Sequence, residues 1–321
     1  MQENNLDLKD RKILYQLDLN SRQSNSEIAK KVGLSKDVVN YRIKKLEEKG
    51  FIKSYYTLID FSKLGYFSVR VYAKFFDATI EKQKEIIDYL VNDNKSFSIT
   101  EIEGPYDFGI MALVKNIYEF EKFYLKFKEK YNQYIQNDKI AIFTGVHHFH
   151  RAYLLNKKID DSSPEYFGRS ELIKHDETDV EILRLLAKNS RIPTIGISKK
   201  LNIPARTIAY RIKQLEKNKV IQAYRFLFNF ELYGYEYYKV DLILKDVTRL
   251  NELIAFAHSH PNIIYIDQTI GGSDFEFDIE LENKQEFRKL MDTLREKFPE
   301  IRTYSYFTAK TYNKLLYFPE N

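Results

Sequence analysis

Residues 9–50 place apolar side chains three and four positions apart, the spacing of amphipathic helices. Ser24 and Glu27 form a capping box for the second of three predicted helices, which Gly33 ends with a turn. Ser35 is a good N-cap for the third helix, and Gly50 closes it. The buried stripes of the three helices are Ile13, Leu14 and Leu17, then Ile28 and Val32, then Val39, Ile43 and Leu46. With a β wing expected over 51–59, this order predicts a winged helix-turn-helix.

After residue 66 the apolar period changes to that of strands, with two helical stretches between them. The predicted strands are 66–76, 96–103, 106–114 and 139–153, and the predicted helices are 81–91 and 118–131. This βαββαβ order is that of a ferredoxin-like unit. It recurs with strands near 235–244, 263–270, 276–282 and 302–311 and helices near 247–258 and 284–297.

The chain is an internal duplication. Placing 7–66 over 176–235 needs no gap, and about 23 of the 60 paired positions are identical. Asn-Ser-Arg at 20–22 recurs at 189–191, and Tyr-Arg-Ile-Lys at 41–44 recurs at 210–213. The second copy lacks side-chain caps, because Pro193 and Pro204 stand where the first has Ser24 and Ser35.

The predicted fold class is α+β, with two winged helix-turn-helix domains that are each followed by a ferredoxin-like domain. Apolar periodicity lapses between the copies, which predicts a linker. The expected domains are 1–60 (winged helix-turn-helix), 61–155 (ferredoxin-like), 156–175 (linker), 176–229 (second winged helix-turn-helix) and 230–321 (second ferredoxin-like domain).

Charge is distributed unevenly along the 321 residues, whose net charge is +5. Residues 6–60 carry about +4 and residues 176–229 about +6, so the remainder is about −5. A basic excess confined to the two helix-turn-helix segments is typical of polyanion binding. The chain has no cysteine, which excludes disulfides and thiolate chemistry, and it shows neither a leader nor an apolar run long enough to cross a bilayer. We therefore expect a cytoplasmic protein without membrane contact.

The third helix of each unit is the candidate DNA-recognition helix, because the face opposite its buried stripe is polar and basic. Lys and Asn can bond base edges, whereas flanking lysines contact phosphates. Arg42 is expected at the rim, bonded to phosphate or to a carboxylate such as Glu47. The candidate DNA-binding residues are Ser35, Lys36, Asp37, Asn40, Tyr41, Arg42, Lys44 and Lys45 in the first copy and Ala205, Arg206, Ala209, Tyr210, Arg211 and Lys213 in the second. A solvated basic face is the plainer interpretation of one such helix, but two copies favour double-stranded DNA as the partner.

The strings "SEIAKKVGLSKDVVNYRIKKLEEKGFIKSYY", "GPYDFGIMALV" and "IAYRIKQLEKNKVIQAY" resemble the Lrp/AsnC (feast/famine) family of transcription regulators. The resemblance implies that the ferredoxin-like (RAM-type) sheets pack face to face, either within one chain as a pseudo-dimer or between chains as a homodimer or higher oligomer. It also implies a small-molecule effector, commonly an amino acid, near the turn between the second and third strands. The implied effector residues are Gly104, Tyr106, Asp107, Gly272 and Asp274. A β-turn that needs Gly for backbone freedom and Asp for local bonding is the favoured explanation of the glycine and aspartate positions by themselves.

Two other functions remain open from the sequence. Siroheme decarboxylases share this architecture, and His147, His148 and His150 lie on a predicted exposed strand with the last two on one face, where they could touch a tetrapyrrole or a metal. Polar decoration of an exposed strand is the more usual explanation of such histidines. A nucleoid-type protein that binds DNA without sequence preference is the other alternative. Since no phosphate loop, catalytic triad or carboxylate pair is found, we expect no catalytic residues, no cofactor and no metal, and hence a regulator that is not an enzyme.

Overall fold

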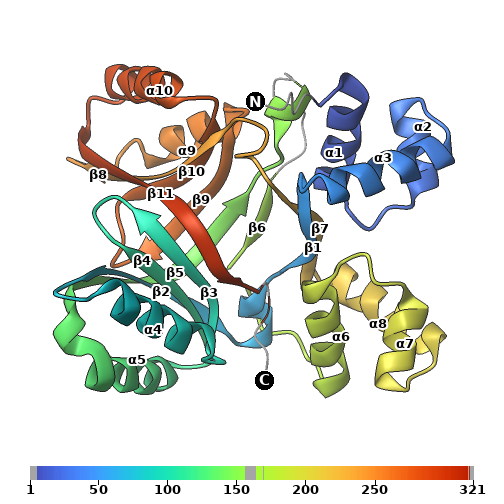
Figure 1. The fold of residues 1–321 in the computed structure, drawn as a ribbon, viewed down its shortest axis with the longest axis horizontal. Helices are drawn as coiled ribbons and strands as arrows, with labels where there is room; N and C mark the ends of the chain where they lie inside the picture. The colour runs from blue at the N-terminus through green and yellow to red at the C-terminus, as the bar shows by residue number, and fades with distance from the viewer. Residues whose placement is uncertain (1–5, 156–163, 169, 317, 319–321) are drawn as a thin grey trace.

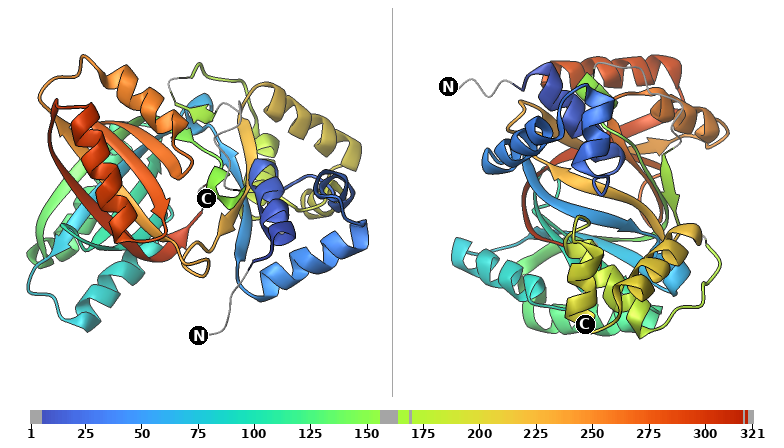
Figure 2. Two further views of the ribbon diagram at one scale, coloured as in Figure 1. Left: turned by 90° about the horizontal axis from the view of Figure 1, so that it is seen from above. Right: turned by 90° about the vertical axis from the view of Figure 1, so that its right-hand side faces the viewer.

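The computed structural model describes residues 6–155, 164–168, 170–316 and 318. It confirms the predicted fold class, two helix-turn-helix units that are each followed by a ferredoxin-like unit (Figure 1). The helix-turn-helix units lie together on one side of the molecule, and the sheets and their covering helices form the other side (Figure 2). No helix of the described residues is long and apolar enough to cross a membrane.

The first helix-turn-helix consists of α1 (Leu8–Leu19), α2 (Asn25–Val32) and α3 (Lys36–Glu48), and the second of α6 (Glu177–Lys188), α7 (Thr194–Leu201) and α8 (Ala205–Lys217). The predicted capping box of Ser24 and Glu27 is present, and the Ser35 hydroxyl accepts a hydrogen bond from the Val38 amide. As expected, Pro193 and Pro204 cap α7 and α8 without a side-chain hydrogen bond. Each recognition helix buries its predicted stripe and leaves the opposite face open.

The strand after each helix-turn-helix is present, but its partner differs from the wing that we expected. β1 (Ile52–Ile59) pairs antiparallel with β7 (Ile221–Phe228), the equivalent strand of the other copy. The two strands form a sheet of their own, the β1–β7 ribbon. Each helix-turn-helix core is completed by the other copy, since Phe226 and Phe228 pack into the first and Ile59 and Leu64 into the second. The ribbon therefore ties the two helix-turn-helix units together.

The first ferredoxin-like unit contains β2 (Phe67–Phe75), α4 (Ile80–Val91), β3 (Ser96–Glu103), β4 (Phe108–Val114), α5 (Ile117–Tyr131) and β5 (Ile135–His148). The second contains β8 (Glu236–Leu244), α9 (Leu250–Ser259), β9 (Ile263–Ile270), β10 (Phe275–Leu281), α10 (Lys284–Lys297) and β11 (Ile301–Leu315). Short 3-10 turns lie at η1 (Phe61–Leu64), η2 (Asn132–Tyr134) and η3 (Ala152–Leu155).

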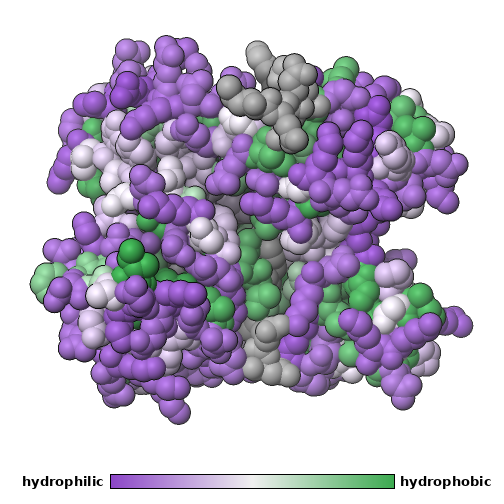
Figure 3. All heavy atoms as spheres, in the orientation of Figure 1, coloured by the Kyte–Doolittle hydropathy of each residue, from purple (hydrophilic) through white to green (hydrophobic). Residues whose placement is uncertain are grey.

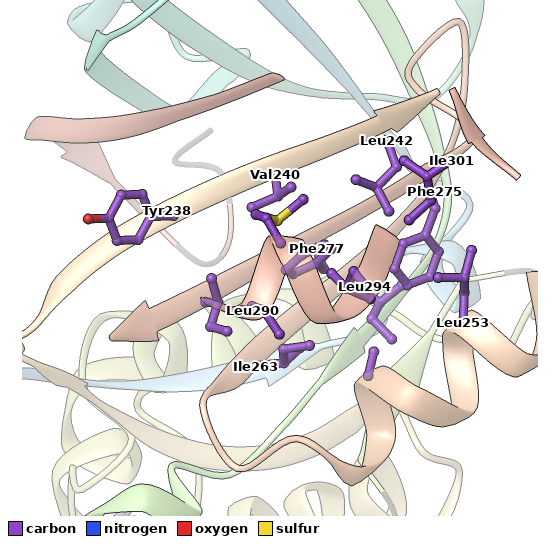
Figure 4. Packing of buried hydrophobic residues seen from close by; sticks show 14 of the residues in the cluster. Tyr238, Val240, Leu242, Leu253, Ile263, Phe275, Phe277, Leu290, Leu294 and Ile301 are labelled. Carbon is purple, nitrogen blue, oxygen red and sulfur yellow. The ribbon is translucent and has the colours of Figure 1, made fainter. Parts of the chain in front are cut away.

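These strands close on themselves within one chain. Their order is β2-β4-β3-β11-β8-β10-β9-β5, and β5 pairs back to β2, so the sheet is a closed ring. The halves are joined where β11 pairs with β3 and where β5 pairs with β9. Alternate side chains point outward and pack under the helices, as the cluster around Val240, Phe277 and Leu294 shows (Figure 4). The other set of side chains points into the ring, which we call the barrel.

The segment that we predicted to be the linker contains a short strand. β6 (Glu165–Phe167) extends the sheet by pairing with the end of β5, with His147 opposite Tyr166. Residues 156–163 of the predicted linker lie outside the described residues. Three residues with polar neighbours carry too weak a periodic signal to be recognised as a strand.

Candidate functional site

The recognition faces of α3 and α8 are open to solvent. The exposed candidates are Ser35, Lys36, Asp37, Asn40, Tyr41, Lys44, Lys45, Arg206, Ala209, Tyr210 and Lys213. Tyr41 and Tyr210 are equivalent residues with side chains 64% and 63% exposed, and the Lys45 ammonium lies 5.9 Å from the Tyr41 ring centroid. Ala205, in contrast, is half-buried at the start of α8.

Arg42 pairs with carboxylates, one of the two kinds of partner that we expected, and Arg211 repeats the arrangement in the second copy. Each is half-buried and pairs with two carboxylates of the first helix of its own unit, Arg42 with Asp7 and Asp10 at 2.7 Å each. In the second unit, Arg211 lies 2.8 and 2.9 Å from the equivalent Asp176 and Asp179. Glu47, the carboxylate that we had considered for Arg42, instead accepts a hydrogen bond from the Tyr55 hydroxyl. The two arginines therefore fix the recognition helix to the helix beside it.

The repeated Asn-Ser-Arg segment joins the two helix-turn-helix units, in an arrangement that we call the interdomain contact. The hydroxyls of Ser21 and Ser190 lie 2.7 Å apart and are buried. Arg22 donates to the Ser190 and Ile192 carbonyls at 2.5 and 2.8 Å. Arg191 reciprocates by donating to the Ser21 carbonyl at 2.7 Å and to the Asn25 side chain at 2.8 Å. This contact is self-complementary, as at a twofold interface, and it fixes the separation of α3 and α8.

A buried ionic network connects the helix-turn-helix units to the barrel. Arg151, which follows β5, bonds Asp18 of α1 at 3.2 Å and Glu280 of β10 at 2.9 Å. Arg225 of β7 lies 3.6 Å from Asp18 and also pairs with Glu165 of β6. Burial raises the pKa of Asp18, but the charges of Arg225 and Arg151 outweigh it and hold the pKa below its usual value.

The sequence analysis missed this network, although one signal was available. Asp18 lies four residues after Leu14, on the buried stripe of α1, and a charge at such a position needs a buried partner. Its equivalent in the second copy is Ala187, so the two units contact the barrel differently. Arg151 and Arg225 carry no local pattern that would identify them as its partners.

A cavity of about 540 Å³ lies inside the barrel, and the β1–β7 ribbon borders it. Apolar and aromatic side chains from both halves form most of its wall. Its charged lining includes Arg70, which lies 2.6 Å from Glu276 and 3.3 Å from Asp267. Lys239 pairs with the same two carboxylates and lies 2.9 Å from Asp278. In Figure 3 the hollow at the centre of the molecule is lined by hydrophobic residues, whereas the outer surface is mostly hydrophilic.

We had expected the three histidines to lie on an exposed strand, but the structure places them in buried or half-buried positions. His148 ends β5 and is completely buried, with its ring stacked 4.6 Å from Tyr265. Burial holds the pKa of His148 well below its usual value. His147 faces His258, with the ring centroids 5.1 Å apart, and burial lowers the pKa of His147 to about 4. His150 lies beyond the strand and contacts Arg225.

The five residues that the resemblance implied for effector binding lie in the β3–β4 and β9–β10 turns, at one end of the barrel. Asp107 accepts a hydrogen bond from the Phe75 amide at 2.8 Å, and Asp274 accepts one from the Leu244 amide at 2.7 Å. Gly104 has φ +153°, and a Cβ added there would lie 2.7 Å from the Cβ of Phe307. Tyr106 stacks on Tyr72, and a Cβ at Gly272 would lie 2.0 Å from the Thr269 hydroxyl. None of the five lines the cavity among the described residues.

The paired recognition helices are matched by known proteins. A family model described as winged helix-turn-helix DNA-binding matches residues 6–53 and again 175–222. An uncharacterised HTH-type transcriptional regulator of Pyrococcus furiosus is 33% identical over 141 residues, which are 44% of this chain and 93% of that protein. Fold and recognition helices together thus define a transcription regulator of the helix-turn-helix class. The chain belongs to the Lrp/AsnC family, as a tandem duplication of its unit.

Some solved structures match less than half of the chain, and others match nearly all of it. An AsnC family regulator from Agrobacterium tumefaciens is 28% identical and covers 43% of this chain and 89% of its own, with a TM-score of 0.39. The siroheme decarboxylase NirDL matches 97% of this chain and 94% of its own with a TM-score of 0.64, at 13% identity. A second structure of that enzyme, in complex with an iron-uroporphyrin III analogue, has a TM-score of 0.63 and 14% identity. The whole tandem arrangement is therefore a known fold.

The expectation that the chain is not an enzyme is wrong, because two solved structures that match 97% of its length are those of an enzyme, siroheme decarboxylase. We based the expectation on the lack of local catalytic motifs. A pocket that many strands build together leaves no such motif in the sequence, because its residues come from distant segments.

Proposed function

We propose that this protein is a sequence-specific transcription regulator whose helices α3 and α8 bind one DNA duplex together. The observation that supports it is the pair of exposed basic faces, held at a fixed separation by the interdomain contact and the β1–β7 ribbon. A single helix-turn-helix contacts one half-site, and two at a fixed separation select the spacing between half-sites.

The two half-sites differ in sequence in this proposal. Tyr41 and Lys44 recur as Tyr210 and Lys213, but Lys36, Asp37 and Asn40 are replaced by Ala205, Arg206 and Ala209. The shared residues suit phosphate contacts that position the protein, whereas the differing residues face the bases. Selection of bound sequences from random DNA is expected to return an asymmetric site. Recovery of a perfect palindrome would contradict the assignment of the base-facing residues.

Charge reversal on both recognition helices tests the proposal. Lys44→Glu combined with Lys213→Glu is expected to weaken duplex binding at low salt at least about tenfold and to reduce its salt dependence, because phosphate contacts are lost. Binding is measured by fluorescence anisotropy at several salt concentrations. The control is Lys122→Glu with Lys284→Glu, which makes the same change of charge at exposed positions of α5 and α10. Equal losses in the two proteins would show that net charge alone attracts DNA.

The cavity supports the further proposal that a small effector adjusts this DNA binding. Residues of both ribbon strands, including Leu58 and Leu227, line the cavity and also carry the connection to the helix-turn-helix units. A ligand inside the barrel would therefore contact the strands that set the geometry of α3 and α8. The expected result is that the effector changes DNA affinity and raises the melting temperature of the free protein.

A tetrapyrrole-converting enzyme is the second candidate function, favoured by the whole-chain likeness to siroheme decarboxylase and by the central cavity. The cavity offers Arg70, Arg151 and Lys239 to a substrate rich in carboxylates. Each of the three already pairs with protein carboxylates, so such a substrate would have to displace them. Titration with siroheme, followed by its visible spectrum and by carbon dioxide release, tests this function. A spectral change that saturates at one equivalent would support it.

A further inference from the structure

The barrel interior differs in chemistry between the two halves. On the second half, alternate residues of β8, β9 and β10 place carboxylates inside the ring, among them Asp267, Asp278 and Glu280. On the first half, the inward residues are small, neutral or aromatic, apart from Arg70 of β2 and Lys139 of β5, whose ammonium donates to the Ser273 hydroxyl. The duplicated sheets therefore enclose one wall rich in carboxylates and one wall with few charges.

The carboxylates outnumber the cations around the cavity. The ionisable side chains that line it, with their ion-pair partners in the described residues, are Asp18, Asp60, Asp267, Glu276, Asp278 and Glu280 against Arg70, Arg151 and Lys239. Each of the three cations has at least two carboxylate partners in this set. The wall is therefore short of positive charge.

One carboxylate in particular lacks full compensation. Asp278 is 7% exposed and accepts a hydrogen bond from the Tyr237 hydroxyl. Of the three cations only Lys239 pairs with it, and Lys239 is shared with Asp267 and Glu276. Burial raises the pKa of Asp278 to about 6 even though Lys239 lowers it, and the charge of Asp267 adds to the rise. A further cation in the cavity would relieve this deficit.

The rest of the wall suits an organic cation rather than a hydrated metal ion. Aromatic rings line the cavity from several strands, including Phe143, Phe228, Tyr237 and Tyr265. Aromatic faces attract ammonium groups that bear apolar substituents, and they bury the apolar part of the ligand. No group of three or more His, Asp or Glu residues in the described part of the chain is placed to hold a metal ion.

We propose that the barrel cavity binds an organic ammonium ion with an apolar body, its charge facing Asp278 and its body against the aromatic wall. Carboxylate ligands are disfavoured, because each cation of the wall is already paired. The site itself is independent of DNA, and only the regulatory consequence of its occupation rests on the proposed function.

Calorimetry on the full-length, DNA-free protein tests the site. The probes are benzyltrimethylammonium, its neutral isostere neopentylbenzene, and phenylacetate. The ammonium ion is expected to bind saturably with one equivalent, and at least about tenfold more tightly than the neutral isostere, since the two differ mainly in charge. Equal binding of the neutral isostere, or tighter binding of phenylacetate, would overturn the proposal.

Two variants locate the site. Asp278→Asn removes one charge at nearly constant volume and is expected to weaken ammonium binding about tenfold. Ala309→Leu extends a side chain that lines the cavity and is expected to abolish binding, whereas Thr303→Leu, at an exposed position of the same strand, leaves it unchanged. Cooperative thermal unfolding confirms that each variant is folded. Wild-type affinity in both Asp278→Asn and Ala309→Leu would refute the site.

A separate measurement addresses regulation. DNA affinity is measured by anisotropy with and without saturating benzyltrimethylammonium, in the wild type and in Ala309→Leu. An effect on the wild type alone supports coupling from the cavity to the recognition helices. If the ammonium ion binds but DNA affinity is unchanged, the site stands and its regulatory consequence is refuted.

Discussion

Removal of both arginines of the interdomain contact is expected to destabilise the protein and to weaken its binding to DNA. Arg22→Ala combined with Arg191→Ala deletes four hydrogen bonds of 2.5 to 2.8 Å, which charged groups donate from partly buried positions. A hydrogen bond to a charged group contributes about 1.5–3 kcal/mol. At partly buried sites, water bonds the carbonyl groups that lose their arginine, so the net loss of stability is smaller. We therefore expect about 2 kcal/mol per arginine and about 4 kcal/mol for the pair.

Urea unfolding measures the loss of stability, and anisotropy with a selected duplex measures the loss of affinity. The control is Arg288→Ala with Arg302→Ala, which removes two exposed arginines from α10 and β11. The control is expected to lose less than about 1 kcal/mol, as exposed substitutions usually do. An interdomain variant that is as stable as the control, and that binds the duplex equally well, would refute a structural role for the contact.

Further predictions concern the barrel. Asp278 has a pKa of about 6 in the folded protein against 3.8 in the unfolded chain. At a pH between these two values, Asp278 is therefore protonated more often in the folded protein than in the unfolded chain. The free energy of unfolding should therefore fall, by up to about 3 kcal/mol, as pH rises through this window. Urea melts across this range should show the loss in the wild type and in the control Asp292→Asn, and a smaller loss in Asp278→Asn, where Asp241, whose pKa burial also raises, still contributes. Gly104→Ala should cost at least about 2 kcal/mol, because φ is +153° and the new Cβ would lie 2.7 Å from the Cβ of Phe307. Gly234→Ala, with φ +90° and no atom within 4 Å of its Cβ, should cost about 1 kcal/mol in the same urea melts. Equal costs for the two glycines would contradict the contact with Phe307.

The helix-turn-helix units were predictable because their signals are local. A serine cap, a helical stripe and a turn glycine lie within a few residues of one another, and the structure shows the cap of Ser24 and the stripe of α3 as expected. Arg42 shows the limit of prediction from local sequence signals. Its spacing within α3 places it beside the recognition face, but its partners Asp7 and Asp10 lie on another helix.

Strand pairing and the barrel interior were not predictable from the same signals. Periodicity identifies residues 52–59 as a strand, yet nothing local shows that the partner is 221–228 rather than a neighbouring wing strand. The alternation in β10, with Glu276, Asp278 and Glu280 opposite the phenylalanines, is typical of a strand with one solvated face. In the structure that face points into a closed ring, and only the pairing of distant strands creates such an interior.

Hydroxyl-radical footprinting on a selected duplex most directly tests whether both recognition helices bind DNA together. The wild type is expected to protect two separate segments on one face of the duplex. Lys213→Glu should remove protection of one segment, and Lys44→Glu should remove protection of the other. A single protected segment that Lys213→Glu leaves intact would show that α8 does not touch DNA, and would contradict joint binding.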